Sequence, residues 1–234
     1  RFIMPFFFPY FDPTYILVIA GVLISIAASA NVNGSFRKYS QVFSQRGIRA
    51  EQDAEMILRG AGIQDVSVQR ISGNLTDHYD PRSKILRLSD SVYGSSSVSA
   101  IGVAAHECGH AIQHARGYAP LAIRSAIVPV VNFASRISMP LILIGLILGY
   151  LQLAQIGVIL FSAVLIFQLV TLPVEFNASR RALNILEDTN ILYGDENTGA
   201  RRVLRAAALT YVASALATAL QLFRLILLTN RRRD

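Results

Sequence analysis

The sequence predicts a mainly α-helical membrane protein, in which about four hydrophobic helices carry a small α+β domain with a short β-hairpin. Composition is the first observation that supports this fold class. Hydrophobic residues make up 53% of the 234 residues and charged residues only 16%, whereas about a quarter is usual in soluble domains. The second observation is a set of four apolar stretches, each near the roughly 20 residues that a helix needs to cross a bilayer. They cover residues 15–30, 137–153, 156–172 and 203–228.

These stretches divide the chain into five predicted segments. A membrane anchor (1–30) comes before a polar domain (31–126), and a transmembrane hairpin (127–173) follows. Next come a helix with a loop (174–202) and a C-terminal hydrophobic helix with a basic tail (203–234). Ala28-Ser29-Ala30 is similar to a signal-peptide cleavage site, but the basic pair Arg37-Lys38 follows the apolar run instead of preceding it. We therefore expect a retained anchor.

The net charge of +7 is explained by the membrane and not by nucleic acid. Basic residues flank the apolar runs, as the positive-inside rule describes, and no basic groove interleaved with aromatic residues is visible. These residues are Arg37, Lys38, Arg116, Arg124, Arg180, Arg181, Arg201, Arg202 and Arg205. The pattern predicts a multi-pass membrane protein, with the polar domain on the cytoplasmic side and the lipid bilayer as a partner.

The final apolar stretch conflicts with this topology. Four full spans would carry Arg231, Arg232 and Arg233 across the membrane, and Arg224 lies inside the last stretch. A final helix that is kinked, re-entrant or surface-bound would remove the conflict. The sequence leaves open whether this helix spans fully.

The polar domain has the periodicity of a helix, two strands and a second helix. Residues 50–59 predict a helix, residues 66–71 and 84–89 alternate like strands, and Asp80-Pro81-Arg82-Ser83 predicts a turn between them. Ser97 is a candidate N-cap for the next helix. An apolar stripe marks the buried face of that helix: Val98, Ile101, Ala105, Cys108 and Ile112.

The second helix carries His106-Glu107-Cys108-Gly109-His110, an HExxH motif. Residues i and i+4 lie on one face of a helix, so both imidazoles can bind one zinc ion. The glutamate after the first histidine is placed to act as a base toward the water of that metal. Cys108 lies on another face, and we expect it to pack in the core and not to act as a ligand.

A catalytic zinc needs a third protein ligand, for which the chain offers three candidates. His114 is about 12 Å along the helix axis from His106, too far for both to bind one ion. His78 precedes the motif in a predicted loop, which favours a role as a polar loop residue or a substrate hydrogen-bond donor. Glu175 follows a tight transmembrane hairpin near residue 155, which returns the chain to the face of the HExxH helix. Pro173 suits a kink or the first turn of a new helix, and the small residues Ala178 and Ala182 share the face of Glu175. We therefore expect Glu175 to be the third ligand.

At this point the chain resembles the YugP-like family of neutral zinc metallopeptidases of bacterial membranes, over nearly its whole length. Four motifs carry the resemblance: residues 75–81 (LTDHYDP), 86–89 (LRLS), 104–111 (AAHECGHA) and 172–179 (LPVEFNAS). The resemblance implies a gluzincin-like α+β catalytic domain with one catalytic Zn²⁺ bound by His106, His110 and Glu175, and with Glu107 as the base. It also implies that the strand around residues 85–88 receives an extended substrate as an added strand. Many gluzincins have an aspartate four residues after the ligand glutamate, but this chain has Ser179, so Asn177 or another acceptor would have to orient the bound histidine.

These features predict a membrane-embedded zinc endopeptidase that acts on a polypeptide substrate, membrane proteins included, by a zinc-activated water with Glu107 as general base. His78, Tyr79 and Arg180 are candidate donors to the oxyanion. The alternative is a non-catalytic zinc-binding scaffold, a partner subunit of a larger membrane complex. Substrate identity, endo- versus exopeptidase action and assembly into a homo-oligomer or complex stay open.

Overall fold

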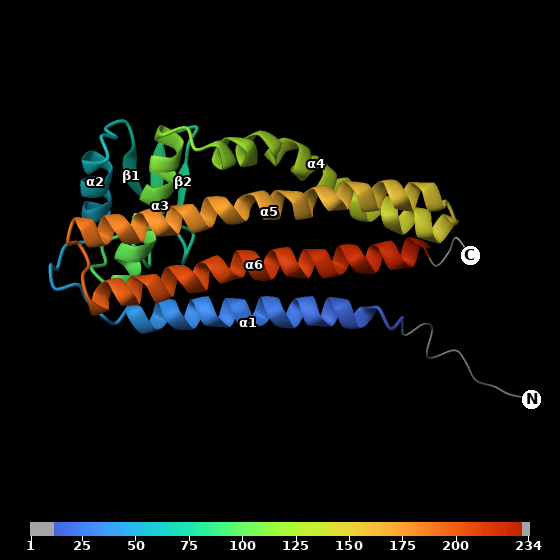
Figure 1. Cartoon of the computed structure of the whole chain (residues 1–234), viewed down its shortest axis with the longest axis horizontal. Coiled ribbons are helices and arrows are strands. Elements are labelled where there is room, and N and C mark those ends of the chain that lie inside the picture. Colours follow the sequence, from blue (N-terminus) through green and yellow to red (C-terminus); the bar gives the residue numbers. More distant parts are fainter. Residues whose placement is uncertain (1–11, 231–234) are drawn as a thin grey trace, which may run out of the picture. The chain divides into compact units, whose positions relative to one another are not determined.

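A computed structural model describes residues 12–230, which form six helices and three strands (Figure 1). The helices are α1 (Tyr15–Tyr39), α2 (Ala50–Gly60), α3 (Val98–Ala115), α4 (Ala119–Leu148), α5 (Leu151–Asp188) and α6 (Asp195–Asn230). The strands are β1 (Ser67–Ile71), β2 (His78–Asp80) and β3 (Ile85–Ser89). Helices α1, α4, α5 and α6 are long and apolar enough to cross a membrane. The predicted fold class, a mainly α-helical membrane protein with a small sheet, is confirmed.

The long helices extend beyond the apolar stretches that predicted them. Helices α4 and α5 meet at Gly149–Tyr150 and not near residue 155. Helix α5 runs without interruption through Pro173 to Asp188. Of the two roles predicted for this proline, a kink or the first turn of a new helix, the second is therefore wrong. The predicted basic tail, residues 231–234, lies outside the described residues.

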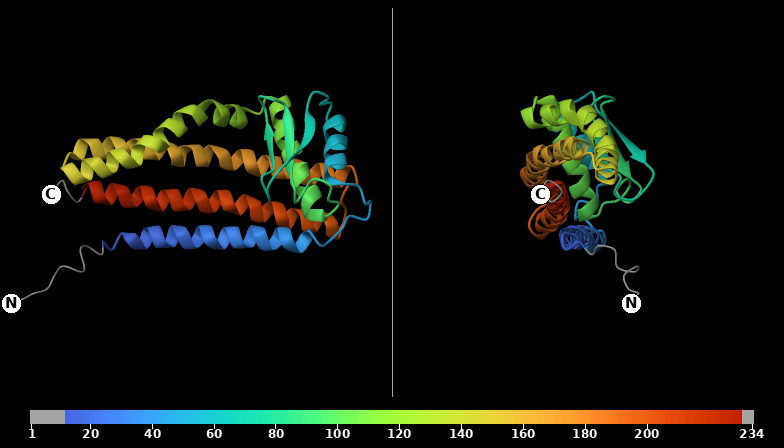
Figure 2. Two further views of the ribbon diagram at one scale, coloured as in Figure 1. Left: turned by 180° about the vertical axis from the view of Figure 1, so that it is seen from behind. Right: turned by 90° about the vertical axis from the view of Figure 1, so that its right-hand side faces the viewer.

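The sheet has the strand order β1-β3-β2. It lies beside α2 and α3 (Figure 2). The predicted turn at Asp80–Ser83 is present, and the Asp80 carboxylate accepts hydrogen bonds there from the Arg82 backbone N–H and the Ser83 hydroxyl. The strands that it joins in an antiparallel hairpin are β2 and β3. The predicted first strand, residues 66–71, is not the hairpin partner, because β1 pairs with β3 in parallel.

The position of β3 overturns the expectation that residues 85–88 receive a substrate strand. Leu86 pairs with Val68 on one side and with Tyr79 on the other, so the backbone groups of β3 are already used by its neighbours. An added strand needs an exposed sheet edge. Within the described sheet, β1 and β2 form the two edges.

The chain forms two compact units, and the one that matters for the HExxH motif comprises Ala28–Val128 and Leu169–Val212. Its core lies among α2, α3, the sheet and the C-terminal part of α5. Buried core residues include Ala54, Leu86, Leu88, Ile101, Cys108 and Leu186. Cys108 is fully buried, and its thiol donates to the backbone oxygen of Ala54, so the prediction that it packs in the core is confirmed.

The other unit contains close helix contacts at small residues. A Cβ on Gly157 would lie 2.6 Å from Ile142, and one on Gly145 would lie 2.5 Å from the backbone of Ala154. Small residues at membrane helix contacts allow such close packing. Arg224, which conflicted with an apolar span, lies over the ring of Tyr15 at 4.2 Å from its centroid. A cation–π contact of this kind reduces the cost of placing a guanidinium within an apolar stretch.

Candidate metal centre

Helix α3 presents the HExxH motif on a face turned away from the core. The helix begins after Ser97, whose side chain accepts a hydrogen bond from the backbone N–H of Ala100 and caps the first turn, as predicted. Ala104, Cys108 and Ala111 are buried on the core-facing side. The histidines are thereby left on the opposite side, where they face a second element.

That second element is α5, which approaches α3 at Gly109 of the motif. A Cβ on Gly109 would lie 2.6 Å from the backbone oxygen of Ala178, so only glycine fits at this contact. Ala178 and Ala182 are fully buried. Small residues on both helices therefore allow the close approach that brings Glu175 to the histidines.

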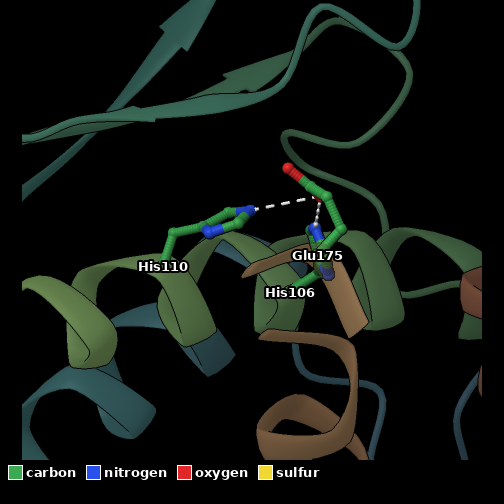
Figure 3. A group of neighbouring side chains, drawn as sticks. All are labelled: His106, His110 and Glu175. Carbon is green, nitrogen blue, oxygen red and sulfur yellow. Dashed lines mark hydrogen bonds and ion pairs between the residues drawn. The ribbon is translucent and has the colours of Figure 1, made fainter. Parts of the chain in front are cut away.

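His106, His110 and Glu175 form one cluster, in which both imidazoles point to the carboxylate (Figure 3). Oε2 of Glu175 lies 3.3 Å from Nε2 of His106 and 3.5 Å from Nε2 of His110. The glutamate is 2% exposed. Among the described residues, these three are the one group of histidine, cysteine and acidic side chains whose ligand atoms lie within 4.8 Å of one another.

The donor set fits a zinc ion. Zinc binds imidazole nitrogen and carboxylate oxygen at about 2.0–2.2 Å, so ligand atoms at the corners of a tetrahedron are roughly 3.3 Å apart. Both measured nitrogen–oxygen distances are close to that separation. Burial alone lowers the pKa of His110, but hydrogen bonding to Glu175 and the charges of Glu107 and Glu175 raise it overall. The surrounding charges thus favour a cation at this nitrogen.

The nitrogen of each imidazole that faces away from the cluster has a protein partner. Ser179 Oγ is 3.1 Å from Nδ1 of His106, and Gln113 Oε1 is 3.1 Å from Nδ1 of His110. Gln113 is fully buried, and its amide nitrogen donates to the backbone oxygen of Val174 and to Asn177. Its Oε1 is therefore the acceptor, so Nδ1 of His110 carries the proton and Nε2 keeps its lone pair for a metal.

Three residues beside the cluster were not predicted from the sequence. One is Gln113, although it is three residues from His110 on the same helix. Another is Arg124, whose guanidinium lies 3.4 Å from Oε1 of Glu175; its charge had been explained by the membrane boundary alone. The third is Tyr211 of α6, whose hydroxyl interacts with the Glu175 carboxylate.

The other side chains predicted for the site lie outside the metal cluster. The Tyr79 hydroxyl is bonded to Nδ1 of His114, at 2.9 Å. His78 lies in β2 and not in a loop, with Nδ1 at 2.9 Å from the Thr76 backbone oxygen and Nε2 beside Arg87. Arg180 is exposed. Asn177 contacts the cluster only through Gln113, and it also accepts a hydrogen bond from Arg181.

Two cavities adjoin the cluster. One, which we name the β2 cleft, has a volume of about 270 Å³ and is lined by His78 and Tyr79 of β2 and by Leu121, Arg124, Ser125 and Val128 of α4. The other, the apolar pocket, measures about 230 Å³ and is lined mainly by aliphatic and aromatic side chains. Asp77, Glu107, Glu175 and Tyr211 line both.

Two further groups near the cavities are structural. The Asp77 carboxylate accepts hydrogen bonds from the backbone N–H and the hydroxyl of Ser89, which fixes the segment before β2 to the end of β3. Burial raises the pKa of Asp77 in spite of these bonds. Burial also raises the pKa of Cys108 well above its ordinary value, which leaves its thiol protonated and unreactive.

The HExxH helix and the buried glutamate of a later helix offer the donor set of two histidines and one glutamate that zinc metallopeptidases use, in a chain with four helices apolar enough to cross a membrane. The chain belongs to the family described as "Putative neutral zinc metallopeptidase", whose model matches residues 14–230. The resemblance found in the sequence is thus confirmed, and with it Zn²⁺ as the cofactor that the family and the cluster support. The chain is 47% identical over 218 residues to the "Putative membrane protease YugP" of Bacillus subtilis (strain 168), an alignment that covers 93% of this chain and 97% of that relative. No solved structure matches the chain.

Proposed function

We propose that the protein is a zinc-dependent endopeptidase of the bacterial cell membrane that hydrolyses peptide bonds in membrane proteins or peptides. The observation that supports this most strongly is the position of Glu107. It adjoins His106 in the chain, is 8% exposed and lines both cavities beside the cluster. A carboxylate between two cavities can take a proton from a water that attacks a substrate lying across them.

His106, His110 and Glu175 would hold the zinc ion, which polarises the scissile carbonyl and lowers the pKa of its water toward about 7. Glu107 accepts the proton as the water oxygen bonds to the carbonyl carbon. It then donates this proton to the amine nitrogen as the carbon–nitrogen bond breaks. Gln113 and Ser179 hold the two imidazoles in orientation throughout.

Tyr211 is our candidate for the group that donates to the oxyanion. Its hydroxyl lies beside Glu175, and it lines both cavities with Glu107. Of the three donors expected from the sequence, Tyr79 is bonded to His114 and Arg180 lines neither cavity. His78 lines the β2 cleft but not the apolar pocket. Tyr211 therefore replaces them in the proposal.

The substrate backbone would extend the sheet at β2. Within the described sheet β2 pairs with β3 alone, so its other side is an edge, and His78 and Tyr79 of this strand line the β2 cleft. Extended peptides bind such edges through main-chain hydrogen bonds. This binding mode would place one half of the substrate in the β2 cleft and its scissile bond beside Glu107.

We also propose that the metal cluster faces the cytoplasm. Arg37, Lys38, Arg201, Arg202 and Arg205 belong to the same compact unit as the cluster and are exposed. The described part of the other unit contains only two basic residues, Arg136 and Arg224. Cytoplasmic segments next to membrane spans are enriched in lysine and arginine.

A scaffold with structural zinc is less well supported. Structural zinc sites are closed by four protein ligands, whereas the cluster of described residues offers three. A site with three protein ligands keeps a position open for water. The scaffold role would also leave Glu107, placed between the two cavities, without a purpose.

The test is cleavage of an unfolded protein by detergent-purified wild type and Glu107→Gln at equal zinc content, read by mass spectrometry. We expect fragments from the wild type only, because the glutamine retains the shape of the side chain but cannot take a proton. Equal cleavage by both proteins would show that Glu107 is not the base. Intact substrate with both zinc-loaded proteins would favour the scaffold role.

A further inference from the structure

The apolar pocket lies on the His106 side of the motif and has no assigned role. Most of its apolar lining comes from three helices: Val32 and Phe36 of α1, Val103 of α3, and Val203, Leu204 and Ala207 of α6. His106 and Glu107 line it as well, so it opens directly beside the reacting groups.

The chemistry of the walls restricts what can enter. The ionisable residues that line the pocket are Asp77, His106, Glu107, Glu175 and Tyr211. His106 and Glu175 belong to the metal cluster, and Glu107 and Tyr211 line both cavities beside it. Among the described residues, no lysine or arginine lines it. An anionic side chain in the pocket would therefore lose hydration without gaining a cationic partner, whereas an apolar one would replace water against aliphatic walls.

The size of the pocket restricts the occupant further. An apolar cavity of about 150 Å³ admits a benzene ring. At about 230 Å³ the pocket has room for the side chain of leucine, methionine or phenylalanine. Ala207 and Ala208 of α6 contribute only methyl groups to the lining, and larger residues there would fill this space.

The two cavities together give the direction of the substrate. Both are lined by Glu107, and only the β2 cleft is lined by residues of the edge strand. A peptide that extends β2 on one side of the scissile bond would present its next residue, across that bond, to the apolar pocket.

We propose that the apolar pocket is the specificity pocket of the enzyme and selects substrates with a large apolar residue next to the scissile bond, on the side away from β2. This inference rests on the proposed peptidase function and adds a substrate class to it. Residues of α1 and α6 thus determine which peptide bonds are cut.

The experiment uses the full chain in detergent with a series of quenched fluorescent peptides. The peptides are identical except for glycine, alanine, leucine, phenylalanine or aspartate beside the mapped cleavage site. We expect wild type to prefer leucine or phenylalanine over alanine by about 10- to 200-fold in kcat/KM, the usual discrimination by hydrophobic pockets. Ala207→Phe, which fills the pocket, should reduce this preference at least about tenfold while the alanine peptide is still cut.

Two further variants are measured beside Ala207→Phe. Ala219→Phe is the control, because Ala219 lies on the same helix with similar partial exposure but outside the pocket lining, and it should keep the wild-type preference. Leu204→Ala enlarges the pocket and should shift the preference from leucine toward phenylalanine. The Leu204→Ala result tests the proposal even if Ala207→Phe does not fold.

A binding measurement separates this proposal from the proposed function. Zinc-loaded Glu107→Gln is titrated with the same peptides, with and without Ala207→Phe, and affinity is read by fluorescence anisotropy. If Glu107→Gln binds the apolar peptides more tightly than the others and Ala207→Phe abolishes this preference, the proposed pocket is supported. Absence of cleavage by wild type would then overturn only the peptidase function. Cleavage with the same preference in wild type, Ala207→Phe and Leu204→Ala would overturn the pocket and leave the peptidase intact.

Discussion

At the scale of single residues, Gln113 fixes the tautomer and the orientation of His110, so that Nε2 of this histidine can bind a metal. Its amide nitrogen is held by the backbone oxygen of Val174 and by Asn177, so its oxygen must accept from His110. Ser179, at the position where many gluzincins have an aspartate, contacts Nδ1 of the other histidine, His106, directly. The orientation of both ligands therefore depends on neutral side chains.

Gln113→Leu should weaken zinc binding about 10- to 100-fold, because Nδ1 of His110 loses its acceptor and the ring loses its fixed orientation. The zinc dissociation constant is measured by competition with a chromogenic chelator. Gln69→Leu, on the exposed strand β1, is the control and should bind zinc like the wild type. Unchanged affinity in Gln113→Leu would show that His110 needs no such partner.

Tyr211→Phe should lower kcat about 100-fold, as is typical when one oxyanion donor is removed, with little change in zinc content. Steady-state kinetics on the best peptide give kcat and KM separately. Tyr193→Phe removes a hydroxyl that bonds to Gln45 away from the cluster and should leave kcat unchanged. A Tyr211→Phe enzyme with full kcat would exclude the hydroxyl as the donor.

The residues of the cluster differ in how far they could be predicted. His106, Glu107 and His110 follow from their spacing on one helix, and Glu175 was inferred from the return of the hairpin to the same side. Tyr211 and Arg124 gave no comparable signal, because each reaches Glu175 only through the packing of α6 and α4 beside α5. Packing between distant helices has no local pattern in the sequence.

At the scale of elements, the contact between α3 and α5 holds the cluster together. Gly109 faces a backbone oxygen of α5, which cannot rotate away as a side chain could. The glycine of the motif is therefore explained by helix packing, independently of metal chemistry.

Gly109→Ala should reduce the free energy of unfolding by about 1–3 kcal/mol, the usual cost of overpacking, and should also weaken zinc binding by separating α3 from Glu175. Thermal unfolding with and without zinc measures both effects. Gly34→Ala in α1 meets no atom within 4 Å and should be neutral or slightly stabilising. Equal stability of Gly109→Ala and wild type would contradict this close contact.

The strands show what the periodicity of the sequence could not predict. Alternation located β1 and β3 but not their relative direction, which depends on pairing partners distant in the sequence. Strand β2 has only three residues, too few for an alternating pattern, although it forms the sheet edge beside the cleft. The sequence divided helix α5 at Pro173 because local propensity disfavours proline inside a helix, whereas α5 continues through it.

At the scale of the whole molecule, composition predicted a mainly α-helical membrane protein, and the described residues include four helices long and apolar enough to cross a membrane. The apolar stretches underestimated helix length, since hydropathy detects the part suited to lipid and not its polar continuation. The distribution of arginine and lysine between the two units supports the proposed orientation.

Cysteine labelling tests this orientation, since the sole native cysteine, Cys108, is fully buried. Asn74→Cys, in an exposed loop of the unit with the metal cluster, should resist a membrane-impermeant maleimide in intact cells and react after lysis. Tyr150→Cys, exposed between α4 and α5, should react in intact cells, because the candidate membrane span α4 lies between it and Asn74 in the sequence. The reverse labelling pattern would place the cluster outside the cytoplasm.

The central claim is that one zinc ion, bound by His106, His110 and Glu175, makes this chain a peptidase. The most direct measurement is stepwise zinc titration of the metal-free protein, with peptide cleavage and X-ray absorption followed on the same samples. The account predicts that activity saturates at about one zinc per chain, with nitrogen and oxygen ligands and no sulfur. Activity that is independent of zinc, or a zinc ion with sulfur ligands, would contradict it.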